Sequence, residues 1–253
     1  MRHCLVVRAL AAGLVLAAVA SVAAAQSSAT SESEVSFNAG LTHLRENRPA
    51  LALEQFKKAI KEDPKNAYAY KGLGLTYARL GKLPDAIASF RKALELNPYY
   101  VDVRNDLGTA LILSGKRAEG KAEFLAAFND ATNPTPEIAA RNLGQAFLEE
   151  KNYPEALNWF RTSFGRNKAY ADPYLGYAEA VTASGRPDEA VAPLEAGAKE
   201  LPGDVGLIAA LGEAYYRTGR FTEARTRLED AVRRDPGGPS GRHAAELLKT
   251  FPK

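Results

Sequence analysis

Small residues recur through the chain at a nearly constant interval, and this period constrains the fold more than any other feature of the sequence. The interval is 34 residues, with one spacing of 36, and the positions are Gly40, Gly74, Gly108, Gly144, Ala178 and Gly212. Sixteen residues after each of them stands a large apolar residue: Phe56, Phe90, Phe124, Phe160, Leu194 and Leu228. A period of this length indicates stacked copies of one small unit rather than a single large core.

Each unit has the pattern of two antiparallel helices. In the second unit, the spacing of apolar residues predicts one helix through Gly74 and another through Ala86 and Phe90. We expect Gly74 to lie against Ala86, where the two helices cross closely. A proline suits the first position of a helix because no N–H donor is needed there. Four second helices are predicted to begin in this way, at Pro49, Pro84, Pro154 and Pro187.

The second unit, YKGLGLTYARLGKLPDAIASFRKALELNP, resembles the tetratricopeptide repeat at nearly every position, and the resemblance extends over about residues 33–236. It implies an all-α fold: a right-handed superhelix, or α-solenoid, of six helix-turn-helix repeats with a concave groove and a C-terminal capping helix. The predicted repeats are 35–66, 67–100, 101–134, 135–170, 171–204 and 205–236, followed by a capping helix and tail over 237–253.

The N-terminal segment is typical of an export signal. Arg2 and Arg8 precede or flank an almost wholly apolar stretch, and the small residues 23–25 form a cleavage site before Gln26. We therefore predict a signal peptide over 1–25, a flexible spacer over 26–34, and a periplasmic or secreted mature protein. An uncleaved segment that anchors the chain is the alternative. Cleavage lowers the net charge from +3 to +1 and removes Cys4, the only cysteine, which precedes the apolar stretch and so is not placed for lipid attachment.

Two units depart from the repeat pattern. The junction between the third and fourth units is two residues longer than the others and contains Pro134 and Pro136, so we expect a longer loop there. The fifth unit has Pro193 inside its predicted second helix, which should kink or weaken that helix. Either a hinge or sequence drift near the end of the array explains this proline.

The sequence lacks the patterns that catalysis or metal binding needs. Beyond the export signal the only histidines are His43 and His243, and His43 occupies a position that is apolar in other units, so we expect it to face the core. No P-loop, HExxH or dinucleotide-binding motif is present. We predict a protein that is not an enzyme and binds no cofactor or metal. The small net charge without a basic cluster gives no reason to expect a nucleic-acid partner.

Function is therefore expected on the surface. In tetratricopeptide proteins the first helix of each repeat faces the groove, and this resemblance implies a groove that binds a peptide or helix of a protein partner. A solvated polar face is the alternative for each residue. The candidate groove residues are Tyr68, Lys71, Leu75, Asn105, Asp106, Thr109, Arg141, Asn142, Gln145, Glu179, Glu213 and Tyr216.

Two groups of tetratricopeptide proteins with more specific functions offer a comparison for this chain. Relatives that hold the C-terminal carboxylate of chaperones need asparagines where this chain has Leu75 and Asp106, so that clamp is absent. The repeat number, the export signal and the junction TPEIAARNLGQAF resemble the pilotin-type tetratricopeptide proteins of type IV pilus assembly, which assist an outer-membrane secretin; those are usually lipoproteins. The resemblance implies an exported scaffold with an envelope-protein partner and no membrane span after cleavage. The alternative is an accessory protein of cell-wall or polysaccharide processes that binds an enzyme or glycan, with Trp159 among the aromatic candidates.

Overall fold

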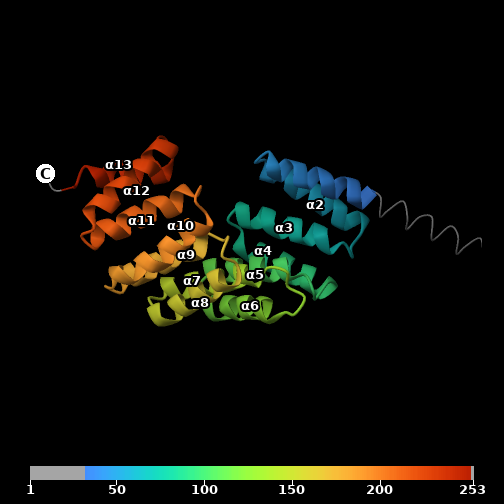
Figure 1. The fold of residues 1–253 in the computed structure, drawn as a ribbon. Coiled ribbons are helices and arrows are strands. Elements are labelled where there is room, and N and C mark those ends of the chain that lie inside the picture. Colours follow the sequence, from blue (N-terminus) through green and yellow to red (C-terminus); the bar gives the residue numbers. More distant parts are fainter. Residues whose placement is uncertain (1–31, 252–253) are drawn as a thin grey trace, which may run out of the picture. The chain divides into compact units, whose positions relative to one another are not determined.

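The structure is a computed structural model that describes residues 32–251, and the regular elements in this part of the chain are all helices, joined by turns and short loops. The predicted export signal with Cys4, the spacer up to residue 31, and residues 252–253 lie outside the described residues. The chain divides after Ser114 into an N-terminal unit and a C-terminal unit, each described here by itself. The all-α fold of consecutive helix pairs is confirmed (Figure 1).

The N-terminal unit begins with a helix over residues 32–45. It continues with α2 (Pro49–Glu62), α3 (Ala67–Arg79), α4 (Leu83–Leu96) and α5 (Val101–Leu113), and each helix from α2 onward packs against the next. The first helix includes residues 32–34, which the sequence analysis assigned to the spacer. This polar stretch can be helical because Ser33 is buried and its hydroxyl donates a hydrogen bond of 2.9 Å to the carbonyl oxygen of Ala59 in α2.

The C-terminal unit contains the remaining helices and packs them in the same sequential way, and α9 also contacts both α7 and α11. In chain order these elements are α6 (Arg117–Asn129), α7 (Pro136–Glu149), α8 (Tyr153–Arg166), α9 (Asp172–Ala183), the 3-10 helix η1 (Pro187–Ala190), α10 (Val191–Glu200), α11 (Val205–Arg217), α12 (Phe221–Arg234) and α13 (Pro239–Leu248).

Fully buried phenylalanine rings lie against glycines, which explains the strongest periodic signal of the sequence. An added Cβ at Gly144 would lie 2.7 Å from the Phe160 ring, and one at Gly176, in the next helix pair, 2.5 Å from it. Phe56 is held between Gly40 and Gly72 in the same manner. Only glycine lets the backbones of two successive first helices approach one ring this closely.

The side chain found nearest to Gly74 is that of Phe90, while the expected approach of Gly74 to Ala86 stays a prediction. The atoms nearest to a Cβ at Gly74 belong to the ring of Phe90, which stands one helical turn after Ala86. A phenylalanine side chain reaches back toward the N-terminal end of its helix, so it covers the position that repeat spacing alone assigned to the alanine. Both Ala86 and Phe90 are buried, so the predicted core itself is present.

The turns within the helix pairs follow the sequence closely. Proline stands at the start of α2, α4, α8 and η1, as predicted. The turn before η1 needs a left-handed residue and has Gly185 there, with φ +80°. At the equivalent turn before α8 the chain has Lys151, with φ +58°, a conformation that costs an ordinary residue about 1–2 kcal/mol.

The two expected irregularities are both present in the C-terminal unit. The loop between α6 and α7 runs over residues 130–135, longer than the loop over 97–100 between α4 and α5, as predicted. In the fifth pair the second helix begins as the 3-10 helix η1, and α10 starts only at Val191. Pro193 thus lies in the first turn of α10, where no intrahelical N–H donor is required. The irregular turn directly precedes Pro193, which has no N–H to bond the carbonyl oxygen of Glu189 four residues earlier.

Candidate functional site

The first helices of the N-terminal unit present an aromatic and charged cluster made of Tyr68, Lys71, Tyr100, Asp102 and Asp106. Tyr68 on α3 is 57% exposed, and its ring lies 5.3 Å from that of Tyr100 in an edge-on arrangement. The ammonium group of Lys71 lies 5.0 Å from the centre of the Tyr100 ring and 3.7 Å from Oδ2 of Asp102. Lys71, which was predicted to orient a partner, therefore already contacts Tyr100 and Asp102 of its own chain.

Burial changes the ionisation of this cluster. Desolvation raises the pKa of Asp106 to about 6, against the attraction of Lys71 and with the help of repulsion from Asp102. Desolvation likewise raises the pKa of Tyr100 to about 12, with contributions from Tyr68 and the two aspartates. A carboxyl group with this pKa changes its charge just below neutral pH.

The other predicted residues of this unit have structural contacts. Leu75 is partly buried and packs against both hydrophobic clusters of the unit, so much of its surface belongs to the core. Thr109 is exposed, and its hydroxyl donates a 3.0 Å hydrogen bond to the carbonyl oxygen of Asn105 one turn earlier.

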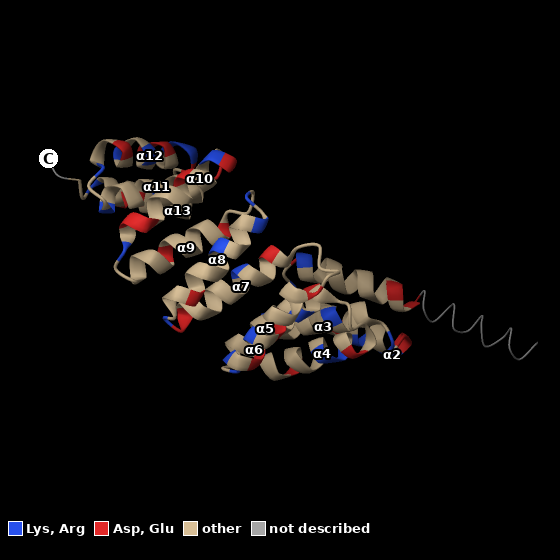
Figure 2. Ribbon diagram, turned by 60° about the horizontal axis from the view of Figure 1, so that its bottom comes forward, with Lys and Arg blue, Asp and Glu red and all other residues tan. Residues whose placement is uncertain are grey.

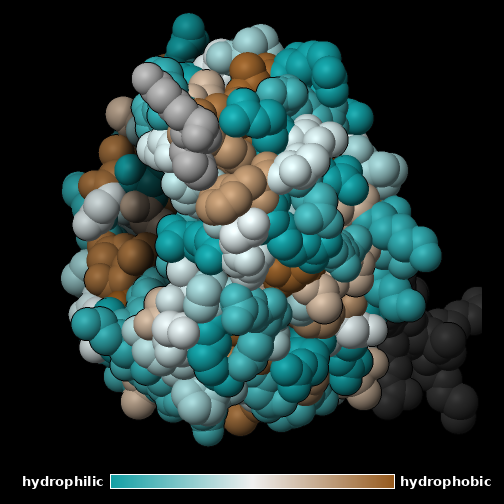
Figure 3. Space-filling view, turned by 60° about the vertical axis from the view of Figure 1, so that its left-hand side comes forward, coloured by the Kyte–Doolittle hydropathy of each residue, from teal (hydrophilic) through white to brown (hydrophobic). Residues whose placement is uncertain are grey.

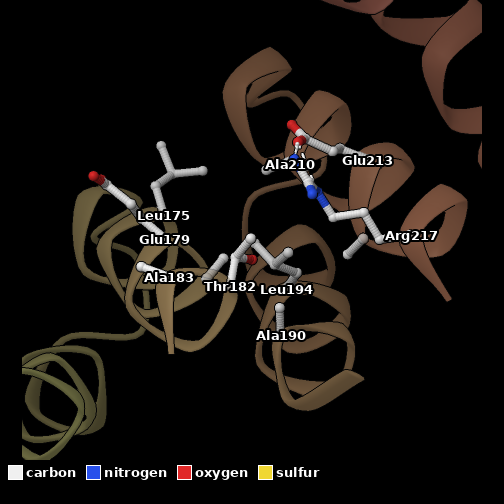
Figure 4. A pocket seen from close by; sticks show the side chains of 11 residues that line it. Leu175, Glu179, Thr182, Ala183, Ala190, Leu194, Ala210, Glu213 and Arg217 are labelled. Atoms are coloured by element: carbon white, nitrogen blue, oxygen red, sulfur yellow. Dashed lines mark hydrogen bonds and ion pairs between the residues drawn. The ribbon is translucent and has the colours of Figure 1, made fainter. Parts of the chain in front are cut away.

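The C-terminal unit has two neighbouring hollows along its first helices. The larger, of about 370 Å³, lies between α9, α10 and α11, and Leu175, Glu179 and Glu213 are among the residues that line it (Figure 4). The smaller, of about 150 Å³, lies between α7 and α9 and is lined by Arg141 and Gln145 together with Leu175 and Glu179. The shared residues Leu175 and Glu179 join the two hollows. Four predicted residues thus line this surface: Arg141, Gln145, Glu179 and Glu213.

Arg141 is paired across the smaller hollow. Its guanidinium lies 3.4 Å from Oδ2 of Asp172 on α9 and donates a 3.2 Å hydrogen bond to the side chain of its neighbour Asn142. Arg141 and Asp172 stand 70 positions after Lys71 and Asp102, respectively, so this pair repeats the arrangement of the earlier pair. Sequence analysis did not include Asp172 among the site residues, although this equal offset was visible.

The two predicted residues on α11, Glu213 and Tyr216, also have hydrogen-bond partners within the chain. Glu213 accepts hydrogen bonds from Nε and Nη2 of Arg217, at 3.0 and 2.6 Å, and lies 2.8 Å from Nε2 of His243. Burial opposes the charged form, but these bonds hold the pKa of Glu213 below its usual range. The hydroxyl of Tyr216 donates a 3.2 Å hydrogen bond to the carbonyl oxygen of Thr250, and the ring lies 4.9 Å from that of Phe251. The C-terminal segment thus covers Tyr216.

The two histidines beyond the predicted export signal each lie beside a glutamate of their own unit. The side chain of His43 is 25% exposed and its Nδ1 lies 3.6 Å from Glu46, while His243 on α13 is 54% exposed. His43 belongs to the N-terminal unit and His243 to the C-terminal unit. Across residues 32–251, no group of three or more His, Cys, Asp and Glu side chains is arranged to hold a metal ion.

The surface offers no dominant charge. Figure 2 shows basic and acidic residues interspersed along the helices, and the face in Figure 3 is mostly hydrophilic with separate hydrophobic patches. Within the described residues, no helix has the length and apolar character needed to cross a membrane.

Sequentially packed helix pairs, with glycines of their first helices against buried side chains of the second helices, define this chain as a helical-repeat protein, and hollows lined by first helices offer a surface suited to protein binding. Three sequence models of the tetratricopeptide repeat match it, the first over residues 7–67 and 37–101, the second over 72–195 and the third over 181–248. The chain belongs to the tetratricopeptide repeat family, as the sequence resemblance indicated. This fold is typically a non-catalytic interaction scaffold.

Solved structures with a similar fold come from several proteins of this type. PilW, a widely conserved type IV pilus biogenesis factor, is 21% identical, with a TM-score of 0.69 over 85% of this chain and 98% of PilW. The pilF protein of Pseudomonas aeruginosa is 19% identical, with a TM-score of 0.68 over 88% of this chain and 100% of its own. YrrB, a tetratricopeptide protein with an unusual peptide-binding site, is 21% identical, with a TM-score of 0.53 over 77% of this chain and 97% of its own. No curated protein matches the chain in sequence.

Proposed function

We propose that this chain is a non-catalytic scaffold that binds a peptide or helix of a protein partner along α7, α9 and α11. The observation that carries this function is the pair of hollows joined through Leu175 and Glu179. Their combined surface crosses three successive first helices and offers both aliphatic contact and polar groups. A peptide lying across it gains apolar burial in the hollows and orientation from the polar side chains at their rims.

We further propose that the protein is exported and acts in the assembly of type IV pili or their secretin. The N-terminal pattern of an export signal and the likeness to two pilus proteins over nearly their whole length support this setting. Because Cys4 precedes the apolar stretch, the proposal includes no lipid anchor. The mature protein would act as a periplasmic component.

Glycan binding has less support. The predicted aromatic contact Trp159 is partly buried and packs edge-on against Phe128, with 5.2 Å between ring centres, so part of its ring is already covered. A flat sugar ring would need exposed aromatic faces, and Tyr99 on the loop before α5 and Tyr68 on α3 are the candidates that retain exposed rings. Neither lies on the two hollows.

Site-specific photo-cross-linking tests the proposal. A photoreactive residue replaces Gln145 on α7, which lines the smaller hollow, and in a separate protein Asn158 on α8, which is exposed but lines neither hollow. We expect cross-links from position 145 to an envelope protein, the pilus secretin subunit in particular, and none from position 158. Equal cross-linking at both positions would place the binding surface elsewhere. Retention on a glycan array without any protein cross-link would favour a role in polysaccharide processes.

A further inference from the structure

The hollow between α9 and α11 has an apolar interior with charges at its rim. Its floor is formed by aliphatic side chains, including the fully buried Leu194 and the small Ala190, with Leu175 at the side shared with the smaller hollow. A volume of about 370 Å³ exceeds that of any one side chain and admits an aliphatic residue of a bound peptide together with its backbone.

The charges around the hollows are paired, with one exception. Glu213 is held by Arg217 and His243, and Arg141 faces Asp172 across the smaller hollow. Among the residues that the structure describes, Glu179 has neither a hydrogen-bond nor an ion-pair partner, and it is exposed. Its place on both hollows therefore leaves one unbalanced negative charge at the boundary between them.

The position of this carboxylate relates it to both hollows. Figure 4 shows Leu175 and Glu179 on α9 across from Glu213 and Arg217 on α11, and the side chain of Glu179 extends to the side away from α11. A chain that crosses from α11 toward α7 passes Glu179 immediately after the larger hollow. An acidic side chain at that point would be repelled, whereas a basic one would form an ion pair.

We propose that the C-terminal unit selects a partner segment in which a basic residue adjoins an aliphatic one, the aliphatic side chain entering the α9–α11 hollow and the basic group pairing with Glu179. This inference rests on the proposed function and adds the chemistry of the partner. Arginine and lysine suit the boundary because their methylene stems can lie along Leu175 while the charged end stays near solvent.

Short synthetic peptides test this selection. Three peptides share glycine and serine flanks and a central Leu-X-Leu, where X is arginine, its uncharged isostere citrulline, or glutamate. Their binding to the ¹⁵N-labelled protein is followed by amide shifts of α7, α9 and α11 at low salt, because exposed ion pairs are screened by salt. We expect the arginine peptide to bind about two- to fivefold more tightly than the citrulline peptide, the range of an exposed ion pair, and the glutamate peptide to bind most weakly.

Two matched variants assign the effect. In Glu179→Gln the preference for arginine over citrulline is expected to disappear. In Glu246→Gln, which removes one exposed carboxylate from α13 outside both hollows, the preference should remain. Circular dichroism checks that both variants keep the wild-type fold.

The possible results separate this inference from the proposed function. Equal binding of arginine and citrulline peptides to the wild-type protein, or a preference that survives in Glu179→Gln, overturns the charge selection and leaves the peptide-binding role intact. Failure of every peptide to shift these helices overturns the inference as well. Only failure of the cross-linking from position 145 would also overturn the proposed function.

Discussion

Substitution of Gly176 by alanine should destabilise the C-terminal unit because the added methyl group would collide with the ring of Phe160. An alanine Cβ at this position would lie 2.5 Å from Phe160, about 1 Å closer than van der Waals contact allows. The ring cannot move toward α7, since Gly144 leaves no more room on that side. Overpacking of this kind costs about 1–3 kcal/mol, and because the ring is held on both sides we take the upper part of this range, about 2–3 kcal/mol, while alanine returns about 1 kcal/mol of helix propensity. We expect Gly176→Ala to lower the free energy of unfolding by about 1–2 kcal/mol.

A double-mutant cycle with Phe160→Ala isolates this contact. The single change Phe160→Ala should cost about 3–5 kcal/mol, because it empties a fully buried site. In that background the added methyl group meets no ring, so Gly176→Ala should stabilise the protein by about 1 kcal/mol. The expected coupling energy is therefore about 2–3 kcal/mol, near the upper end of what contacting residues show. Denaturant unfolding measures all four proteins through circular dichroism and through the fluorescence of Trp159, the only tryptophan.

Gly165→Ala provides the control. Gly165 lies in α8, and a Cβ added there would meet no heavy atom within 4 Å, so this substitution should be neutral or stabilising by up to about 1 kcal/mol. If Gly176→Ala behaves like Gly165→Ala, or has the same effect with and without the Phe160 ring, the steric explanation of the repeated glycines is refuted.

Three further predictions concern other parts of the chain. Burial raises the pKa of Asp106 to about 6, so its contribution to stability is fully present below the unfolded pKa near 4 and is lost, by roughly 3 kcal/mol in total, as pH rises from there through 6. Denaturant unfolding at pH 4 and 8 should show most of this fall in the wild type but not in Asp106→Asn, which should be the more stable protein at pH 8. Lys151→Gly should raise the free energy of unfolding by about 0.5–1 kcal/mol, because glycine adopts the left-handed backbone conformation without strain, and Gly185→Ala should lower it for the converse reason. Thermal unfolding curves in which Lys151→Gly is destabilising would contradict this account. Export should shorten the full-length chain to a product that begins at Gln26, and an intact N-terminus in mass spectra of the envelope fraction would favour the anchored alternative.

The repeat period predicted those parts of the fold that depend on local spacing. The positions of small, large and proline residues in each unit were enough to predict the helix pairs and the burial of Phe56 and Phe160. The same positions predicted the prolines near the start of the second helices. The direct neighbour of Gly74 did not follow, because it depends on how far the Phe90 side chain reaches back along its helix. The 3-10 start of the fifth pair could be anticipated only in part: Pro193 indicated a disturbed helix, and the irregular turn lies just before it, where a proline offers no N–H to the carbonyl group four residues earlier.

The candidate site was less predictable because surface charges have no period imposed by the core. Lys71 and Arg141 were expected to contact a partner, yet each lies beside an aspartate of the next first helix. Their equal offsets in sequence were the available signal, and it required comparison of two units rather than inspection of one. Tyr216 is covered by a segment beyond the last repeat, where the repeat pattern no longer applies.

If the chain binds a peptide as proposed, the C-terminal segment that covers Tyr216 also limits the length of that peptide. With α13 and residues 250–251 against α11, the binding surface ends at that helix, and it extends from there to α7. Neighbouring packed helices lie about 8–10 Å apart, so the surface spans about 20 Å between the axes of α7 and α11. An extended chain covers this distance in about six residues, at about 3.3 Å each. The recognised element is therefore expected to be a short linear motif, and placing it within a longer unstructured region of the partner should leave its affinity nearly unchanged.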